Sequence, residues 1–462
     1  MSRAISQSAF DTSLRRYGRS WGLWLLLLVA PIGARYMIPH GDGTGVVIAI
    51  GQHLPVMTAA FLGVSLGIVV STLLLPIAWI YLRSNTTRRQ PWQVEEVTAA
   101  SRVAIALGRF GADATVLLGV LAALTVAGWI LGVLIPLEGG FHAGEIALGL
   151  WLVAAPALLG IAALRILFDA MPATRGGFGD FLYFVTWMVS LIAPMGAMDR
   201  AASFGANMYD FPGFVRPLQY GAPGGGTDFA IGGIEVLAGT VKLDVMAGLF
   251  SPGYIAARLA WAAIAVALVV VAGLVYRPHR ATQRQVVPGR LARWTSAGPP
   301  PAVATVPVVP KRIAVPLLGL VVAEARLILA GRLNRLLALG ALALAVLHPD
   351  FRHVASPAAL LLMVFAFSAQ AGRSEARGLL RLTVTAPQSP MVRRVAFVIA
   401  GSVLALGFAL PGLLHAAPSV ILTAFAVGSA AAVIAMALAM LSGSAFAGRA
   451  LLCIVWYIYL SS

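Results

Sequence analysis

The sequence predicts an all-α polytopic membrane protein with about 11 transmembrane helices in two similar bundles, accompanied by amphipathic helices at the membrane interface. The chain of 462 residues is 60% hydrophobic and 11% charged, and its mean hydropathy is +0.89. Apolar stretches of the roughly 20 residues that one span requires recur from Trp21 almost to the C-terminus. They lack the alternation of barrel strands, so each is expected to be a helix.

The first apolar stretch resembles a signal peptide because basic residues precede it. It leads into Arg35 and Tyr36 without a small-residue cleavage site, so we expect it to be retained as a span. The first half is expected to hold six spans, near residues 21–38, 56–82, 113–136, 143–170, 180–198 and 257–276. The second half is expected to hold five, near residues 333–348, 355–370, 394–412, 418–441 and 443–460. Uncertain boundaries leave roughly 10–12 spans in total.

The distribution of lysine and arginine predicts a cytoplasmic N-terminus. The loops that this orientation places inside hold most of the basic residues: Arg15, Arg16, Arg19, Arg83, Arg88, Arg89, Arg102, Arg109, Arg175, those within 277–335 and 373–394, and Arg449. The outer loops hold Arg35, Arg200, Arg216, Lys242, Arg258 and Arg352. We therefore expect a multi-pass protein of the plasma (inner) membrane. This bias also accounts for the net charge of +16 without a nucleic-acid partner.

Two long loops suggest the domain organisation. Residues 199–256 are rich in glycine and aromatic residues and are expected to form an outer loop. Residues 277–313 are rich in proline and arginine and are expected to form an extended cytoplasmic linker. The linker would separate a first transmembrane half, 1–276, from a second, 314–462.

The two halves follow one plan, which indicates an internal duplication. Each opens with a basic amphipathic segment that leads into a span, SAFDTSLRRYGRSWGLWLLLL in the first half and VVAEARLILAGRLNRLLALGALAL in the second. Each second span is followed by a charged loop that contains V-T-A, and RGGFGDFLYFVTW, ending at Trp187, aligns with SAFAGRALLCIVW, ending at Trp456. The pattern favours parallel copies, between which transporters place their pathways. Chance similarity between apolar segments is the alternative.

The sequence contains no recognisable energy-coupling or hydrolytic motif. A phosphate-binding loop needs a lysine directly after a glycine, and neither Lys242 nor Lys311 is placed in this way. The motifs HExxH and GxSxG are absent, and no Cys/His group has metal-ligand spacing. We therefore expect no catalytic residue, no metal site and no bound cofactor in this chain.

Ionisable residues are scarce at the centres of the expected spans, which disfavours an ion-coupled carrier. Asp113, Asp180 and Arg258 fall near expected span ends, where long side chains reach the interface by snorkelling. Arg165 and Asp169 lie four residues apart on one helix and can pair. Their interpretation is either a structural ion pair or a gating pair.

This plan resembles the permease subunit of type-2 ABC exporters. The resemblance rests on the basic segment before the first span at 10–19, the charged loop with VTAASR at 97–102, six spans in the first half, an outer segment before the sixth span, and RGGFGDFLYFVTW at 175–187. It implies outward transport of an amphipathic or apolar substrate, such as a peptide or lipid-like molecule. It also implies that a separate cytoplasmic P-loop ATPase, in two copies, binds ATP and Mg²⁺.

The resemblance assigns roles to charged residues on the cytoplasmic side. The expected ATPase-docking residues are Arg83, Arg88, Arg89, Glu95, Glu96, Arg102, Arg373, Glu375, Arg377 and Arg381. The residues of the two elbow helices, which would lie in the interface, are Arg15, Arg16, Arg19, Glu324, Arg326 and Arg332. Alternatively, all these charges are simply solvated at the membrane surface.

The chain departs from this family because it holds almost two permease units. A second permease chain or an outer partner that completes the pathway is therefore left open. Two other functions are also left open: a membrane scaffold that binds a partner through residues 199–256, and an ion-coupled carrier that uses Arg165 and Asp169.

Overall fold

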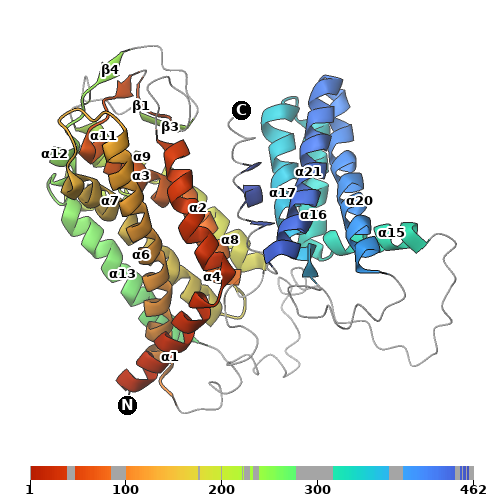
Figure 1. Ribbon diagram of the computed structural model, residues 1–462, viewed down its shortest axis with the longest axis horizontal. Coiled ribbons are helices and arrows are strands. Elements are labelled where there is room, and N and C mark those ends of the chain that lie inside the picture. Colours follow the sequence, from red (N-terminus) through yellow and green to blue (C-terminus); the bar gives the residue numbers. More distant parts are fainter. Residues whose placement is uncertain are drawn as a thin grey trace. The chain divides into compact units, whose positions relative to one another are not determined.

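The computed structural model divides into two compact units, Met1–Arg284 and Gln285–Ser462 (Figure 1). The residues that it describes are 2–38, 47–51, 53–84, 100–174, 177–198, 200–220, 222, 229–232, 239–276, 316–373, 389–442, 448–449, 451–453 and 455–456. The boundary between the units falls within the expected linker 277–313. That linker lies outside the described residues, as do most of the two expected docking loops, at 85–99 and 374–388.

Seven helices within the described ranges are long and apolar enough to cross a membrane, so the chain is a multi-pass membrane protein. They are Ala59–Arg83, Arg102–Leu134, Ala143–Ala170, Tyr254–Val275, Phe351–Gln370, Pro390–Leu414 and Pro418–Leu441. Three shorter apolar helices are Gly22–Gly33, Leu182–Met198 and Asn334–Leu347. The expected span 443–460 is described only in part.

The first unit is a bundle of long helices. They are α1 (Ser2–Gly18), α2 (Trp21–Met37), α3 (Ala59–Val69), α4 (Leu75–Ser84), α6 (Arg102–Leu134), α7 (Ala143–Ala170), α8 (Gly177–Ile192) and α13 (Tyr254–Val275). A π-helical turn, η1 (Val70–Leu74), joins α3 to α4. Helices α3, α6 and α13 pack against α7, while α1 and α2 pack against α6. The α7 helix is therefore central to this bundle.

The third span begins earlier than the predicted 113–136. Helix α6 starts at Arg102 because the Ser101 hydroxyl accepts a hydrogen bond from the backbone N–H three residues later, at 3.3 Å. Its 33 residues measure about 50 Å, whereas the hydrocarbon core is about 30 Å thick. Part of α6 must therefore project beyond the hydrocarbon. Helix α1 lies against its first half, where a Cβ atom added at Gly108 would be 2.3 Å from the carbonyl oxygen of Ser6.

The described residues of 199–256, a range expected as a loop, form part of a folded cap at the end of the first unit opposite α1 (Figure 1). The cap contains α9 (Met195–Met198), α10 (Phe204–Asn207), α11 (Val215–Gln219), α12 (Val245–Leu249), the antiparallel strands β1 (Val47–Ile50) and β3 (Phe229–Gly232), and the parallel strands β2 (Leu54–Pro55) and β4 (Thr240–Val241). Phe214, Leu218 and Leu249 are buried in one cluster with Phe61 of α3. The described residues of the cap therefore share a buried apolar core with α3 and α7.

Arg258 does not snorkel as expected, because its side chain is almost completely buried. Its guanidinium group donates to the carbonyl oxygens of Asp210, Phe211, Leu152 and Val153, at 2.8–3.0 Å. The side chain therefore links the second turn of α13 to the middle of α7 and to the cap.

Asp210 stabilises the same part of the cap. Its buried carboxylate accepts hydrogen bonds from the backbone N–H groups of Gly213, Phe214 and Val215 at 2.8, 3.3 and 2.8 Å. Burial raises the pKa of Asp210, and the charge of Arg258 and these N–H groups oppose the rise. The turn before α11 is thus held by a single side chain.

The second unit is also helical. It contains α15 (Pro316–Ile328), α16 (Arg332–Leu347), the π-helical turn η4 (Phe351–Ala355), α17 (Ser356–Gln370), α20 (Pro390–Ala409), the 3₁₀ turn η5 (Leu410–Leu414) and α21 (Pro418–Ser442). Helix α15 runs across the ends of the longer helices (Figure 1). The core is rich in alanine and includes the Phe367 and Phe397 rings, whose centroids are 6.2 Å apart.

The two units share an order of helix contacts. The helix before the first span packs on the third span in both, α1 on α6 and α15 on α20. The second span packs on the fourth, α3 on α7 and α17 on α21, and the third packs on the fourth, α6 on α7 and α20 on α21. Segments that the predicted duplication aligns therefore have corresponding neighbours in the two units.

The aligned tryptophans make equivalent contacts. The indole Nε1 of Trp187 donates to the carbonyl oxygen of Thr72 at 2.7 Å, and that of Trp456 donates to the carbonyl oxygen of Pro357 at 2.8 Å. Both acceptors belong to the second span of their unit, within or just after a π-helical turn. The indole groups thus bond corresponding places in the two units, Thr72 within η1 and Pro357 two residues after η4.

A second polar contact lies seven residues before each tryptophan. In the first unit Asp180 pairs with Arg83, and in the second the Arg449 Nε donates to the hydroxyl of Ser368 at 2.8 Å. Arg83 and Ser368 each follow the carbonyl bonded by the tryptophan by 11 residues. Helix α8 in the first unit and the segment of Arg449 and Trp456 in the second are thus each attached to the expected second span at the same two places, with different residue types at one of them.

Candidate functional site

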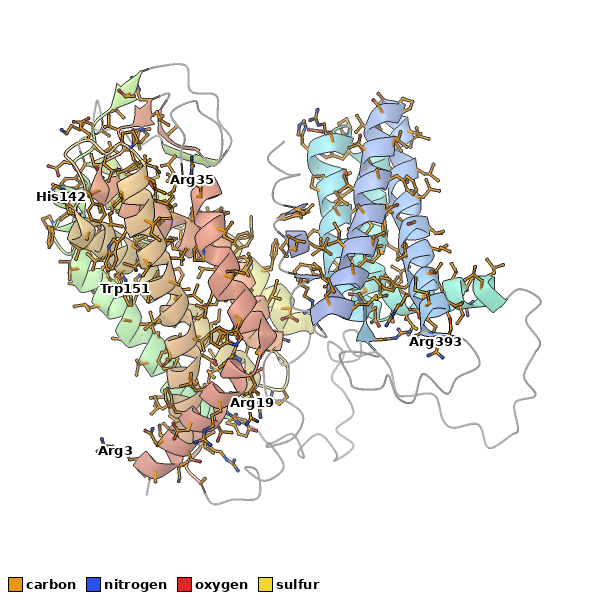
Figure 2. All side chains as sticks on the ribbon, in the orientation of Figure 1. Arg3, Arg19, Arg35, His142, Trp151 and Arg393 are labelled. Carbon is orange, nitrogen blue, oxygen red and sulfur yellow. The ribbon has the colours of Figure 1, made fainter. Side chains whose placement is uncertain are left out.

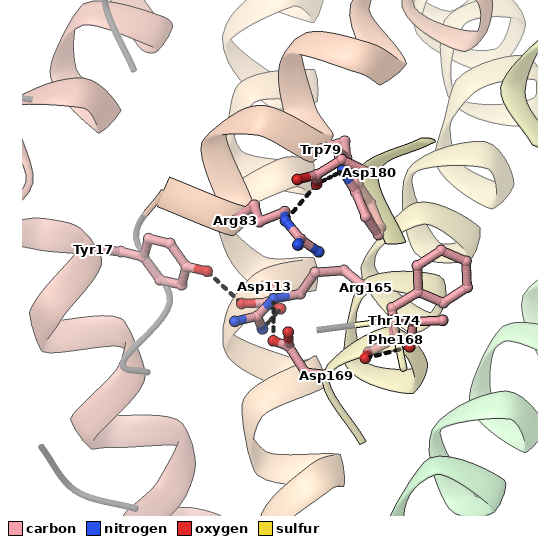
Figure 3. Close-up of polar contacts among 9 residues, drawn as sticks. All are labelled: Tyr17, Trp79, Arg83, Asp113, Arg165, Phe168, Asp169, Thr174 and Asp180. Atoms are coloured by element: carbon pink, nitrogen blue, oxygen red, sulfur yellow. Dashed lines mark hydrogen bonds and ion pairs between the residues drawn. The ribbon is translucent and has the colours of Figure 1, made fainter. Parts of the chain in front are cut away.

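A buried group of charged residues joins α1, α6 and α7 in the first unit (Figure 3). The Tyr17 hydroxyl donates to the carboxylate of Asp113 at 2.5 Å, and the Arg165 Nη1 donates to the other oxygen of that carboxylate at 2.7 Å. The Arg165 Nε lies 3.3 Å from an Asp169 oxygen. Their exposed fractions are only 4%, 2%, 5% and 7% for Tyr17, Asp113, Arg165 and Asp169. These four residues are called the ionic cluster.

Small residues of α6 allow α1 to reach this cluster. Gly108 lies against the backbone of α1, and a Cβ atom added at Gly111 would be 3.2 Å from the Phe10 ring. Tyr17 is the last residue but one of α1, and the Ser20 N–H closes the helix end on its carbonyl oxygen at 2.9 Å. The end of α1 is therefore held close to Asp113.

The cluster contains two carboxylates and one guanidinium group, so its formal charge is −1. Charges removed from water are stable only when paired and hydrogen-bonded, and Arg165 pairs with both Asp113 and Asp169. Burial, and then the charge of Asp113, raises the pKa of Tyr17. Its hydroxyl therefore stays protonated and acts as the donor. Separation of α1 from α6 would remove this donor from a buried carboxylate.

A second polar group ties α4 to α8 (Figure 3). Arg83 pairs with Asp180, and the Trp79 Nε1 donates to the same Asp180 oxygen at 3.1 Å. The Arg83 guanidinium lies 5.7 Å from the centroid of the Trp79 ring, which stacks on Tyr183 at 4.1 Å. Only 10% of the Arg83 side chain is exposed, so this contact is largely removed from water.

The expected docking residues fall partly outside the described ranges. Those outside are Arg88, Arg89, Glu95, Glu96, Glu375, Arg377 and Arg381. Arg102 is the first residue of α6, and its guanidinium lies 5.5 Å from the centroid of the Tyr276 ring. Arg373 follows α17 and its Nη2 donates to Glu324 at 2.8 Å. Arg83, Arg102 and Arg373 thus have contacts within their own units, and docking stays a prediction.

The elbow residues differ in exposure. Arg15 and Arg19 are exposed on and after α1, Arg16 is half-buried, and Arg326 is exposed on α15. Glu324 is largely buried, and burial raises its pKa while Arg373 and Arg393 oppose the rise. The side chain of Arg332 lies outside the described residues.

Sequence reasoning identified Arg165 and Asp169 but missed Tyr17 and Asp113 as their partners. The contact between Tyr17 and Asp113 spans 96 positions. Among the described residues, no three His, Cys, Asp or Glu side chains gather as a metal site. Comparisons of the chain with protein-family models, curated proteins and solved structures found no match.

Proposed function

We propose that this chain is the permease of an ATP-driven exporter of the type-2 ABC class, powered by a separate cytoplasmic ATPase that binds ATP and Mg²⁺. Its main support is the ionic cluster, through which the interfacial helix α1 contacts α6 and α7. A partner that pulls on α1 would act directly on Asp113 and, through it, on Arg165. Because unpairing buried charges is costly, the two spans are expected to follow α1.

The second unit supports the same proposal. Helix α15 packs on α20 as α1 packs on α6, and Glu324 joins α15 to Arg373 at the end of α17. The equivalent contacts of Trp187 and Trp456 favour two copies of one ancestral unit. We propose that the chain has about 11 spans in two such bundles and that it carries an amphipathic or apolar substrate, such as a peptide or lipid-like molecule, out across the membrane.

The distribution of charge supports an orientation with α1 in the cytoplasm. Arg3 and Arg19 lie at the α1 end of the first unit, whereas Arg35 and His142 lie towards the other end (Figure 2). Arg83, Arg102 and Arg109 also belong to helix ends near α1. Basic residues favour the cytoplasmic side, so the folded cap would face outward from the plasma membrane.

Co-purification with an ATPase tests this proposal. The tagged chain is expressed with each P-loop ATPase encoded beside its gene and purified in a mild detergent. We expect one ATPase to be retained and its hydrolysis to depend on the chain. A chain that elutes alone with every candidate, and that changes no hydrolysis rate, contradicts the proposal.

An ion-coupled carrier is a second candidate, supported by the two carboxylates that share one buried guanidinium group. Buried ionisable residues in spans commonly serve proton or ion pathways. Substitution of both Arg165→Met and Asp169→Asn should then abolish uptake driven by an imposed ion gradient without ATP. Transport that requires ATP and is unaffected by the ion gradient would exclude an ion-coupled carrier.

A further inference from the structure

We propose that one side of the folded cap is inserted in the headgroup region of the lipid bilayer, beside the membrane-spanning helix α13. This side carries two phenylalanines that are about half exposed, Phe204 at the start of α10 and Phe250 directly after α12. Exposed apolar surface of this kind marks a contact with a membrane or with another protein. The inference depends on the membrane-spanning helices alone and does not rest on the proposed transport function.

The length of α13 fixes the depth at which the helix begins. Its 22 residues measure about 33 Å, which is close to the hydrocarbon thickness of about 30 Å. Unlike α6, this helix has almost no length beyond the hydrocarbon, even with a modest tilt. Its N-cap residue, Gly253, is therefore at the hydrocarbon boundary on the side of the cap.

Contacts around Gly253 place both phenylalanines near the same depth. A Cβ atom added at Gly253 would be 2.3 Å from the backbone nitrogen of Phe204, so the two backbones lie in contact. The Nδ2 of Asn207, the last residue of α10, donates to the carbonyl oxygen of Pro252 at 3.1 Å. Phe250 precedes Gly253 by three residues. Helix α10 and the end of α12 are thus held at the hydrocarbon boundary.

The exposed face of α13 continues the apolar surface of the two phenylalanines. This helix is the least buried of the seven long apolar helices. The exposed side chains of its first two turns are Ile255, Ala256 and Leu259, all of them apolar. Arg258 in the same turns is buried and bonds α7 and the cap instead. Because this surface runs without a break from a membrane span to the cap, the bilayer is the expected occupant.

A tyrosine and an arginine of the same segment also suit the membrane interface. Tyr209 follows α10 and is about half exposed, and the guanidinium carbon of Arg200 lies 4.5 Å from the centroid of its ring. Tyrosine is enriched at headgroup depth, and arginine covers apolar surface while its charged group stays in a polar environment. Phenylalanine rings of interfacial segments reach the boundary of the acyl chains. The residue types around α10 therefore agree with the depth derived from α13.

A spin label at Gly205 measures the depth of α10 and keeps both rings. A Cβ atom added at Gly205 would meet nothing within 4 Å, so Gly205→Cys can carry the label. The full chain with Cys453→Ala is reconstituted in phosphatidylcholine vesicles, and collisions of the label with oxygen and with a water-soluble nickel chelate report its depth. Leu259→Cys is the reference in the hydrocarbon. Thr240→Cys on β4, at the far edge of the cap, is the reference in water (Figure 1).

The label at Gly205 should lie between the two references. Because Leu259 is six residues beyond Gly253, its label should be about 9 Å deeper than the label at Gly205. Phe204→Ser with Phe250→Ser should move the Gly205 label towards water. Phe141→Ser removes an exposed ring before α7 and should leave the label unchanged. A Gly205 label as accessible to the nickel chelate as the Thr240 label, or one that the double substitution leaves in place, would contradict the insertion. Circular dichroism of each variant checks that it is folded.

Photo-cross-linking in native membranes identifies what contacts the two rings. The photoreactive residue p-benzoylphenylalanine replaces Phe204, Phe250 or, as the control, Thr240, one position at a time, and the mass of each adduct is measured after illumination. We expect phospholipid adducts at Phe204 and Phe250 and none at Thr240. Equal lipid adducts at all three positions would contradict the insertion. Adducts with the second unit, with a second copy of the chain or with another protein would assign this side of the cap to a protein contact and overturn it.

Discussion

The Arg258 Nε donates to the carbonyl oxygen of Leu152 at 3.0 Å. In a regular helix this carbonyl accepts the N–H four residues later, but that residue is Pro156, which has none. The guanidinium group therefore satisfies a backbone acceptor that proline leaves without a partner. The same side chain donates three further hydrogen bonds. It therefore joins the turn of α7 that lacks a backbone hydrogen bond to the folded cap.

Substitution of Arg258→Met should lower the free energy of unfolding by about 3–5 kcal/mol, because buried carbonyl groups and Asp210 lose their charged partner. Chemical denaturation of the purified chain measures this change. The control is Arg200→Met, which removes an exposed arginine beside Tyr209 and should cost about 1 kcal/mol or less. Equal effects of the two substitutions would contradict the role of Arg258.

A double-mutant cycle tests the contact with Leu152 specifically. Pro156→Ala supplies an N–H that can bond the Leu152 carbonyl without Arg258. Pro156→Ala should therefore recover about 1 kcal/mol in the Arg258→Met background, and the two changes should not be additive. Additive effects would show that the carbonyl gains nothing from the new donor.

Removal of the Tyr17 hydroxyl should loosen α1 from α6. Tyr17→Phe keeps the ring but deprives the buried Asp113 carboxylate of a donor, and hydrogen bonds to charged groups contribute about 1.5–3 kcal/mol. Amide hydrogen exchange should therefore accelerate throughout α1 and remain unchanged in the cap. Tyr209→Phe makes the same chemical change at an exposed site and serves as the control. If amide exchange of α1 in Tyr17→Phe were as slow as in Tyr209→Phe, the role of the Tyr17 contact would be refuted.

The two aligned tryptophans should be equivalent within their units. Trp187→Phe and Trp456→Phe each remove one hydrogen bond to a carbonyl of the second span, worth about 1 kcal/mol. Hydrogen exchange near Thr72 and near Pro357 should accelerate to a similar extent. Trp129→Phe removes a bond from an exposed indole and serves as the control. A strong effect in one half alone would argue against equivalent roles.

The stability contribution of Glu324 should depend on pH. Burial raises its pKa in the folded chain, so the folded state binds this proton more tightly than the unfolded state. The contribution of Glu324 to folding stability is complete below its pKa in the unfolded chain. It is lost as the pH rises through its pKa in the folded chain. The melting temperature of the native chain relative to Glu324→Gln should therefore fall as pH rises through this window.

Asp350 provides a control of opposite sign. The His353 backbone N–H donates to its carboxylate at 3.0 Å and lowers its pKa. The contribution of Asp350 to folding stability is present above its pKa in the unfolded chain. It is lost as the pH falls through its pKa in the folded chain. The melting temperature relative to Asp350→Asn should therefore rise with pH. The same trend for both substitutions would contradict the assignment of Glu324.

Sequence periodicity and composition located most helices because the membrane imposes length and apolarity on each span. Predicted helix boundaries were less accurate where an N-cap hydrogen bond determines the first residue of the helix. Ser101 starts α6 eleven residues before the predicted span, and the polar residues that follow belong to the projecting part of the helix. The folded cap was missed because its core depends on contacts between segments distant in sequence.

The ionic cluster was only half predictable. Arg165 and Asp169 are one helical turn apart, so their pairing follows from the helix repeat. Asp113 was expected to snorkel because it precedes a long apolar stretch, yet the structure buries it. Its partner Tyr17 lies on another helix, and only the close packing of α1 at Gly108 brings them together. Helix packing of this kind has no local sequence pattern.

The proposed coupling requires α1 to move against α6 during ATP hydrolysis, and the distance between two labels measures this movement. In a Cys453→Ala background, Ser8→Cys on α1 and Thr115→Cys on α6 carry spin labels, and the chain is reconstituted with its ATPase in vesicles. We expect ATP and Mg²⁺ to shift the distance between the labels and Tyr17→Phe to diminish the shift. A distance that ATP leaves unchanged, but that changes with an imposed ion gradient, would contradict an ATP-driven movement of α1.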